Sequence, residues 1–273
     1  MRLSIVQMNS GSVPESNLAQ LRGLLEQAAD NGAQLVVLPE NFALMSENQA
    51  QRCALAEEDA NGPIQAAVAD LAQKYSLWIV AGTIPIRSSD SQRPFASCCV
   101  YDASGERAGR YDKIHLFDVQ LPDGSGAYSE SSYTTPGNRP AVVTTPWGRL
   151  GLAVCYDLRF PELFREMSAG GVDLITLPAA FTVATGRAHW QSLLRARAIE
   201  NQCLVAAAAQ TGQHSGSRST WGHSMVLDGW GRILTDLGDT IGIECVDIDM
   251  DAMSKMRRQF PSLRHRRPEI FDR

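Results

Sequence analysis

The sequence lacks the features that would place the protein in a membrane or around a metal ion. No run approaches the roughly 18 apolar residues needed to span a bilayer. The segment Met1–Asn9 lacks the continuous apolar core of a secretory signal. The five histidines form no His-x-x-x-His pair, and the cysteines form no Cys-x-x-Cys pair. We therefore expect a soluble, cytoplasmic protein without a metal or other cofactor.

Excess positive charge is also missing. The formal net charge is −5, which argues against nucleic acid as the main partner. The basic cluster within Arg257–Arg267 is short, and we expect it to form a surface or subunit contact. The six cysteines are expected to be reduced thiols, because a disulfide framework is typical of exported proteins.

No linker divides the 273 residues, of which 44% are hydrophobic. Such a chain can bury a substantial core, and we expect one domain, residues 1–273. Strands and helices alternate along it. Expected strands are 3–8, 35–38, 78–81, 96–101, 141–144, 150–154, 174–177, 203–208, 223–227 and 241–248, and expected helices are 17–31, about 187–201, and two that begin at Pro63 and Pro161.

One internal repeat indicates how these elements are arranged. Gly32–Pro39 matches Gly171–Pro178 at its Gly, at two Leu and at its Pro. Each copy follows a helix and precedes a loop with functional residues. A helix–strand unit used twice suggests two sheets related by a pseudo-twofold axis, with helices outside them. The predicted fold is an α/β protein, a four-layer αββα sandwich.

The most informative single residue is Cys155. It follows the apolar run Leu150–Val154 and precedes Pro161, which suits the first turn of a helix. A turn there can lift the thiol from the core and surround it with free backbone N–H groups, so that the thiol could attack a carbonyl. Taken alone, the same pattern fits a small buried hydrophobe equally well.

Two further segments change that balance. Leu35–Asn41 is a strand that ends in Glu40, and Tyr111–Asp118 carries Lys113. Each alone also fits a helix-start acid or a surface charge. Together with Cys155, in this chain order, they resemble the Glu-Lys-Cys arrangement of the carbon–nitrogen hydrolase (nitrilase) superfamily. The resemblance runs from Leu3 to about Phe271.

The resemblance implies an αββα fold, a small-molecule amide substrate and a homodimer or higher homo-oligomer. It also implies that Glu130, which could otherwise be an exposed loop acid, orients Lys113 and the substrate. Amide cleavage requires a base near Cys155, and Glu40 is expected to serve if burial and an acidic neighbour raise its pKa. Lys113 and the backbone N–H of Tyr156 are expected to donate to the oxyanion.

Other catalytic arrangements fit less well. Gly222–Val226 lacks the last Gly of a Gly-x-Ser-x-Gly elbow. The acids that begin at Asp247 resemble a calcium loop, but Ala252 and Arg258 occupy its sixth and twelfth positions. A Cys155–His115 protease pair lacks the papain-type cysteine signature. A true nitrilase, acting on a C≡N group, fits the motifs less well than an amidase.

Within the superfamily the chain resembles the Nit branch. Lys113–Asp118, Cys155–Glu162 and His189–Gln202 carry this resemblance, and Ala206–His214 is more similar to deaminated-glutathione amidases than to ω-amidases. The former implies cleavage of an α-ketoglutaramyl–Cys-Gly amide to 2-oxoglutarate and Cys-Gly. The latter implies hydrolysis of α-ketoglutaramate or a related dicarboxylate monoamide.

Both substrates carry an anionic keto-acid head, which requires a fixed cation. The candidates are Arg159, Arg187 and Arg218, with His214 near the peptide-like tail; structural ion pairs are an equal alternative for each arginine. A non-catalytic scaffold or binding subunit is the remaining alternative. The joint presence of Glu40, Lys113, Glu130 and Cys155 counts against it.

Overall fold

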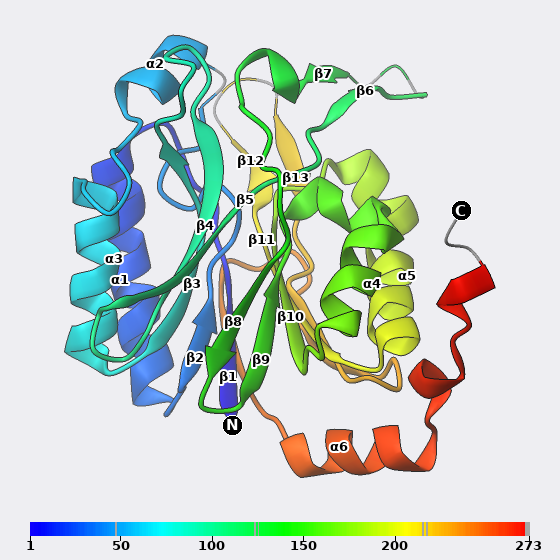
Figure 1. Ribbon diagram of the computed structural model, residues 1–273. Coiled ribbons are helices and arrows are strands. Elements are labelled where there is room, and N and C mark those ends of the chain that lie inside the picture. The colour runs from blue at the N-terminus through cyan, green and yellow to red at the C-terminus, as the bar shows by residue number, and fades with distance from the viewer. Residues whose placement is uncertain (47, 123, 125, 215, 217, 271–273) are drawn as a thin grey trace.

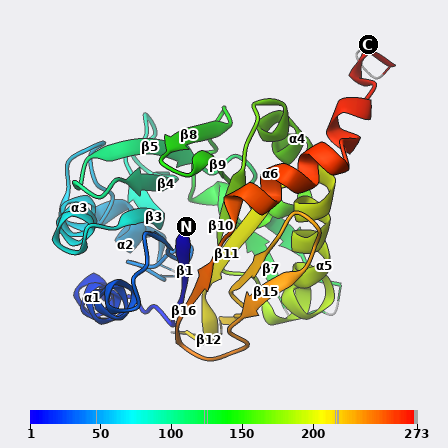
Figure 2. The ribbon, with the colours of Figure 1, turned by 90° about the horizontal axis from the view of Figure 1, so that it is seen from below.

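Two six-stranded sheets lie face to face with helices on both outer sides, as the computed structural model in Figure 1 and the view in Figure 2 show. The structure describes residues 1–46, 48–122, 124, 126–214, 216 and 218–270. Phe271 and the other two final residues of the expected 1–273 domain lie outside this description. The predicted four-layer αββα sandwich is confirmed.

The two sheets share one pattern of strand directions. The first has the order β16 (Gly242–Asp247), β1 (Arg2–Gln7), β2 (Leu35–Val37), β3 (Trp78–Ile86), β4 (Phe95–Tyr101) and β5 (Arg107–Asp112). The second has the order β8 (Ala141–Thr145), β9 (Gly148–Leu152), β10 (Leu174–Ala179), β11 (Leu204–Ala209), β14 (Met225–Leu227) and β15 (Ile233–Asp236). Read this way, successive pairs in both sheets are antiparallel, parallel, parallel, antiparallel and antiparallel.

The repeated segment occupies equivalent places in this pattern. Its first copy forms β2 and its second forms β10, and each is the third strand of its sheet with parallel neighbours on both sides. Strands buried on both faces are typically continuous apolar runs, which explains why both copies are rich in Leu, Ile and Val. The sequence repeat therefore reflects the two-sheet symmetry.

Helices cover the outer face of each sheet. Helices α1 (Pro14–Asp30) and α3 (Pro63–Tyr75) lie on the first sheet, and α4 (Pro161–Ala169) and α5 (Val183–Asn201) on the second (Figure 2). Helix α1 begins three residues before the expected Asn17, because Pro14 occupies its first turn. Helix α5 begins at Val183, because the side chain of Thr182 caps it by accepting a hydrogen bond from Thr185 N.

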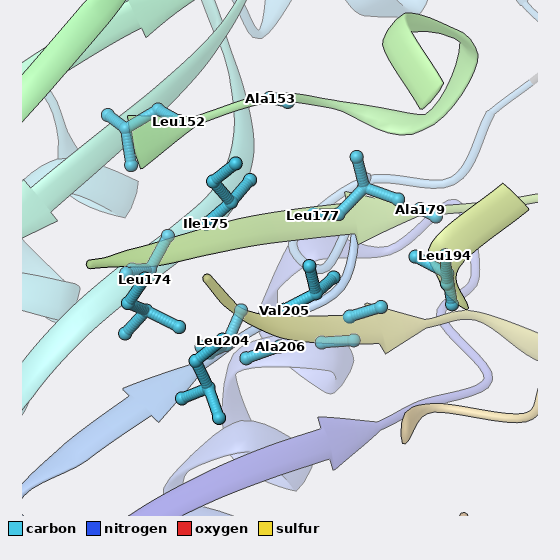
Figure 3. Packing of buried hydrophobic residues seen from close by; sticks show 14 of the residues in the cluster. Leu152, Ala153, Leu174, Ile175, Leu177, Ala179, Leu194, Leu204, Val205 and Ala206 are labelled. Atoms are coloured by element: carbon cyan, nitrogen blue, oxygen red, sulfur yellow. The ribbon is translucent and has the colours of Figure 1, made fainter. Parts of the chain in front are cut away.

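The core has two parts. Cys98 packs in a cluster with the strands of the second sheet, whereas its neighbour Cys99 packs with α1 and α3; the two side chains thus point to opposite faces of β4, as expected. Figure 3 shows how Leu174, Ile175 and Val205 fill the space around the second sheet. Between the sheets, β1 packs against β11 and β5 against β8.

Several elements were not predicted, and most are short or polar. They are α2 (Gln49–Ala54), α6 (Met250–Gln259), β5, β15, and the hairpins β6–β7 (Asp118–Gln120, Ala127–Ser129) and β12–β13 (Thr211–Gln213, Ser219–Trp221). Helix α6 lies across the end of the second sheet, where Arg257 binds Gln202 and Asp173, and the described residues after it extend away from the sandwich (Figure 2). Among the described residues, no helix combines the length and apolar character that crossing a bilayer requires.

Candidate active site

Three chain segments bring the predicted catalytic side chains to one cavity. Glu40 follows β2, Lys113 directly follows β5, and Cys155 begins the 3₁₀ helix η2 (Cys155–Arg159), which follows β9. All three line the same cavity. About 520 Å³ of space free of atoms lies within and in front of it, part of it open to solvent, so a small molecule can enter from outside.

Cys155 lies at a strained turn. Its backbone φ is +49°, a conformation that costs a non-glycine residue about 1–3 kcal/mol and that is concentrated at functional sites. The residue is 8% exposed. Two apolar residues continue β9 to this turn, and Pro161 opens α4 behind it. The predicted strand–turn–helix geometry of Cys155 is therefore present.

A buried carboxylate holds this turn in place. Asp157 accepts hydrogen bonds from the backbone N–H of Val154 at 2.8 Å and from the hydroxyl of Tyr111 at 2.7 Å. Its other oxygen accepts from the backbone N–H of His115 at 3.1 Å and lies 2.7 Å from Nδ1 of the same residue. His115 thus pairs with Asp157 and stacks on Phe160 at 3.7 Å between ring centroids, an arrangement that explains it without a Cys155–His115 protease pair.

Glu40 is held by both sheets. Its backbone oxygen accepts a hydrogen bond from Nε2 of Gln210, at the end of β11, at 3.0 Å. The next residue, Asn41, has a left-handed backbone with φ +58° and donates its N–H to Oγ1 of Thr83 at 2.8 Å. These bonds fix the turn that follows β2, so the carboxyl group enters the cavity from a rigid support.

Lys113 connects the two carboxylates of the site. Its Nζ lies 2.8 Å from Oε1 of Glu40 and 2.8 Å from each carboxyl oxygen of Glu130. The side chains of Lys113 and Glu40 are 2% and 5% exposed. Glu130 also accepts a hydrogen bond from the backbone N–H of Phe117 at 2.7 Å. Glu130 is therefore a buried partner of Lys113 and not an exposed loop acid.

The charges of these groups are set by one another. Burial alone would raise the pKa of Glu40, but the charge of Lys113 and hydrogen bonds from Lys113 and Cys155 more than offset it, so the pKa is lowered. We expected a raised pKa from burial and an acidic neighbour, and this expectation was wrong. The reason is that Oε1 of Glu40 lies 2.8 Å from the ammonium of Lys113, whose charge favours the carboxylate.

The pKa values of the Cys155 thiol and the Lys113 amine are raised, whereas that of Glu40 is lowered. Burial and then the neighbouring charge of Glu40 raise the pKa of Cys155 well above its ordinary value. Burial would lower the pKa of Lys113, but Glu130 and Glu40 raise it well above its ordinary value. The resting site therefore holds an ionised Glu40, an ionised Lys113 and a neutral Cys155 thiol, which can give its proton to the carboxylate.

The backbone around Cys155 supplies donors for an oxyanion. The N–H of Tyr156 lies in the first turn of η2, where N–H groups have no partner within the helix. Its ring lines the cavity and packs edge-on against Phe117 at 5.0 Å between centroids. The role of the Tyr156 N–H as the second oxyanion donor stays a prediction.

The four predicted substrate-binding residues are not brought together. Arg218 lines the cavity. Arg159 lies behind the lining residues, with its guanidinium 5.5 Å from the ring centroid of Phe181 and 3.3 Å from Nδ1 of His189. Arg187 is exposed on α5 and lies over the ring of Trp221. These two arginines make cation–π contacts instead of lining the cavity.

His214 is a structural residue. It is 6% exposed, with Nδ1 2.9 Å from the oxygen of Ser10 and Nε2 2.7 Å from Oγ1 of Thr220. Burial lowers its pKa. Because both ring nitrogens already have partners, the expectation that His214 contacts a substrate tail was wrong.

Sequence analysis missed several residues that line the cavity. The most important is Arg52, on the six-residue helix α2, whose guanidinium carbon lies 5.0 Å from the ring centroid of Tyr133. Thr182 and Thr185 at the start of α5 also line it. Helix α2 has no buried residue and hence no apolar stripe, so its only sequence signal was the capping residue Asn48.

No arrangement in the described part of the chain suits a metal ion. Within it, three or more His, Cys, Asp or Glu side chains nowhere gather closely enough to hold one. The carboxylates of the cavity face Lys113 instead.

Comparisons with known proteins show the family to which this chain is similar. The sequence profile of the family described as carbon-nitrogen hydrolase matches residues 2–258. A deaminated glutathione amidase of Yersinia enterocolitica is 45% identical over 266 residues, which cover 97% of this chain and 92% of that protein. A mouse deaminated glutathione amidase is 38% identical, with coverage of 98% and 84%.

Solved structures show the same fold. The crystal structure of Caenorhabditis elegans NitFhit superposes with a TM-score of 0.92 at 36% identity; the match covers 98% of this chain and 65% of that longer protein. A Nesterenkonia sp. AN1 amidase superposes with a TM-score of 0.78 at 27% identity, covering 96% and 98% of the two chains. That amidase was solved with acrylamide added to its active-site cysteine.

Proposed function

The chain belongs to the carbon–nitrogen hydrolase family, and we propose that this amidohydrolase cleaves the amide of deaminated glutathione, releasing 2-oxoglutarate and Cys-Gly. The observation that carries the mechanism is the buried cluster in which Lys113 lies 2.8 Å from both Glu40 and Glu130. The substrate assignment is supported by the full-length similarity to deaminated glutathione amidases of bacteria and mammals.

In the first half of the reaction, Cys155 becomes acylated. Glu40 takes the thiol proton while Sγ bonds to the carbonyl carbon of the amide. The tetrahedral oxyanion accepts hydrogen bonds from Tyr156 N–H and from Lys113, for which Glu130 must leave one ammonium proton free. Glu40 then gives the proton to the amide nitrogen, the carbon–nitrogen bond breaks, and Cys-Gly leaves with a thioester remaining on Cys155.

In the second half, water enters the position of the leaving amine. Glu40 takes a proton from this water, and the hydroxide adds to the thioester carbon. The carbon–sulfur bond breaks, Glu40 returns the proton to the sulfur, and 2-oxoglutarate leaves. Glu40 is thus the base and the acid in both halves, and Lys113 remains an ammonium throughout because Glu130 and Glu40 raise its pKa.

A coupled assay for 2-oxoglutarate tests the substrate assignment. Deaminated glutathione and α-ketoglutaramate, run side by side, differ only in the group that leaves. The proposal predicts a higher kcat/KM for deaminated glutathione. A clear preference for α-ketoglutaramate would identify an ω-amidase instead, and turnover of neither compound by the pure, folded protein would refute both assignments.

We also propose that the enzyme works in the cytoplasm as a homodimer or a larger homo-oligomer. Support comes from two large exposed aromatic side chains, Trp230 and Phe260, which are 55% and 54% exposed and pack edge-on at 5.7 Å between centroids. Exposed apolar side chains in contact are typical of subunit interfaces. Light scattering on the protein as it elutes from a size-exclusion column measures the subunit count. A monomer at micromolar concentration would contradict this proposal.

A further inference from the structure

Two arginines from distant parts of the sequence line the catalytic cavity. Arg52 comes from α2 in the first half of the sequence, and Arg218 directly precedes β13 in the second half. Both line the cavity with Glu40, Lys113 and Glu130. The charged side chains around this space are thus three cations and two carboxylates. Because Lys113 already pairs with both carboxylates, the two guanidinium groups give the lining of the cavity an excess of positive charge.

Neither guanidinium is neutralised within the described part of the chain, where no carboxylate oxygen lies within 4.0 Å of either one. Arg52 donates from Nε to the backbone oxygen of Ser46 at 2.7 Å and lies over the ring of Tyr133. In Arg218, Nε is buried and has no hydrogen-bond partner among the described residues. A buried donor without a partner costs about 1–3 kcal/mol.

The two cations also disfavour each other. Burial lowers the pKa of Arg52, and the charge of Arg218 lowers it further. A pair of like charges that line one cavity is unfavourable, and an anion between them would reduce the repulsion and give Nε of Arg218 a hydrogen-bond partner.

We propose that Arg52 and Arg218 together bind the carboxylate at the far end of the acyl group, the end remote from the scissile amide. This inference rests on the proposed function, because it assigns the site of the keto-acid head. A guanidinium presents its donors in a planar fork that matches a carboxylate. Lys113 does not take this role, because it pairs with Glu40 and Glu130 and its remaining donor is assigned to the oxyanion at the scissile carbonyl.

The arginine pair determines specificity for the acyl half of the substrate and not for its leaving group. Deaminated glutathione and α-ketoglutaramate share the acyl half and differ in the leaving half. The arginine pair therefore selects dicarboxylate monoamides as a class and does not distinguish these two substrates. Arg159 and Arg187, which the sequence suggested for the same role, are not among the residues that line the cavity, and they lie over the rings of Phe181 and Trp221.

Binding of the product 2-oxoglutarate tests this pair without turnover. In a Cys155→Ala background, calorimetry should show that Arg52→Gln and Arg218→Gln each weaken binding by at least about tenfold. Arg52→Lys and Arg218→Lys, which keep the charge, should recover part of the loss. Arg22→Gln, on the exposed side of α1, is the matched control and should bind as the parent does. Unchanged binding in both Gln variants would overturn the proposal, as would a loss that appears in Arg187→Gln instead.

Turnover separates this inference from the proposed function. With Cys155 present, the ratio of kcat/KM for glutaramate over pentanamide, its analogue with a methyl in place of the head carboxylate, should fall at least about tenfold in each Gln variant. Equal losses of kcat/KM on both amides would show that the two arginines have a structural role. That result would overturn the proposed arginine pair and leave the proposed amidase activity intact. If 2-oxoglutarate binding depended on the arginines but the protein turned over no amide, the proposed function would be refuted and the proposed arginine pair would be supported.

Discussion

Gln210 donates a hydrogen bond from its amide to the backbone oxygen of Glu40 at 3.0 Å, across the interface between the two sheets. The same amide group donates to Oγ of Ser10 at 2.8 Å, and its oxygen accepts from the N–H of Ser10 at 3.0 Å. All three residues are buried. The base of the proposed reaction is therefore positioned by a side chain that touches neither substrate nor thiol.

Replacing Gln210 should disturb catalysis through Glu40. Gln210→Met keeps the volume but removes three hydrogen bonds, and we expect stability to fall by about 1–3 kcal/mol. We expect kcat to fall about tenfold or more with a smaller change in KM, since a misplaced base slows the chemical step. Urea unfolding and steady-state kinetics measure both. Gln73→Met, exposed on α3, is the control; equal behaviour of the two variants would contradict the positioning role.

Glu40→Gln tests the proton acceptor itself. The amide oxygen can still accept from Lys113, so the fold should persist, but the side chain can no longer take the thiol proton. We expect kcat/KM to fall by roughly 10²–10⁴. The 2-oxoglutarate assay measures the rate, and circular dichroism confirms that the variant is folded. Activity within a few-fold of the parent would remove Glu40 from the mechanism.

The pKa shifts predict an unusual pH dependence for alkylation. The pKa of Glu40 is lowered from 4.5, so its carboxylate is already present above that pH, whereas the pKa of the Cys155 thiol is raised from 9.0. If Glu40 takes the proton during attack, the rate of Cys155 alkylation by iodoacetamide should be nearly constant between these two values. A free thiol in solution, such as N-acetylcysteine, should react about tenfold faster per pH unit below its own pKa.

Peptide mass spectrometry resolves the individual cysteines in this experiment. If the logarithm of the Cys155 rate rose with pH in parallel with that of the free thiol, the attack would come from a thiolate without help from Glu40. With help from Glu40, Cys155 should be the fastest of the six cysteines at pH 7, because it combines a neighbouring base with a cavity that is open to solvent. Slow labelling of Cys155 would favour the non-catalytic scaffold.

Lys113 should stabilise the fold as well as the reaction. Lys113→Met leaves Glu40 and Glu130 buried and facing each other without a cation, and breaking a buried ion pair from one side costs about 3–5 kcal/mol. The loss should be present at pH 7, above the ordinary carboxyl pKa of 4.5, and should shrink on acidification as carboxylates protonate. Urea unfolding measures it. Lys74→Met, exposed on α3, should change stability by less than about 0.5 kcal/mol.

Much of the fold was predictable from local patterns. Short apolar runs became β2 and β10, and a proline opens each of α3 and α4. Each of these signals determines the conformation of only the few residues around it. The strained turn at Cys155 was also indicated, because a buried strand ends immediately before a helix-opening proline. These signals depend on short-range sterics and burial, which a single sequence displays directly.

The charge state of the site and part of its lining were not predictable. Strand β5 is polar because it lies near the edge of its sheet, so no alternation marked the strand that positions Lys113. Arg52 and Arg218 are distant in sequence and meet only through the folded cavity. The lowered pKa of Glu40 depends on a 2.8 Å contact with Lys113, and no spacing in the sequence reveals such a distance.

The most direct test of the account is the mass of the enzyme during turnover. Acid quenching in the steady state with deaminated glutathione should trap a 2-oxoglutaryl thioester on the peptide that contains Cys155. The same adduct should form from α-ketoglutaramate, because the acyl halves are identical, and it should be absent from Cys155→Ala, which should also release no 2-oxoglutarate. Turnover by Cys155→Ala at the parent rate, with no acylated cysteine in either protein, would contradict the account.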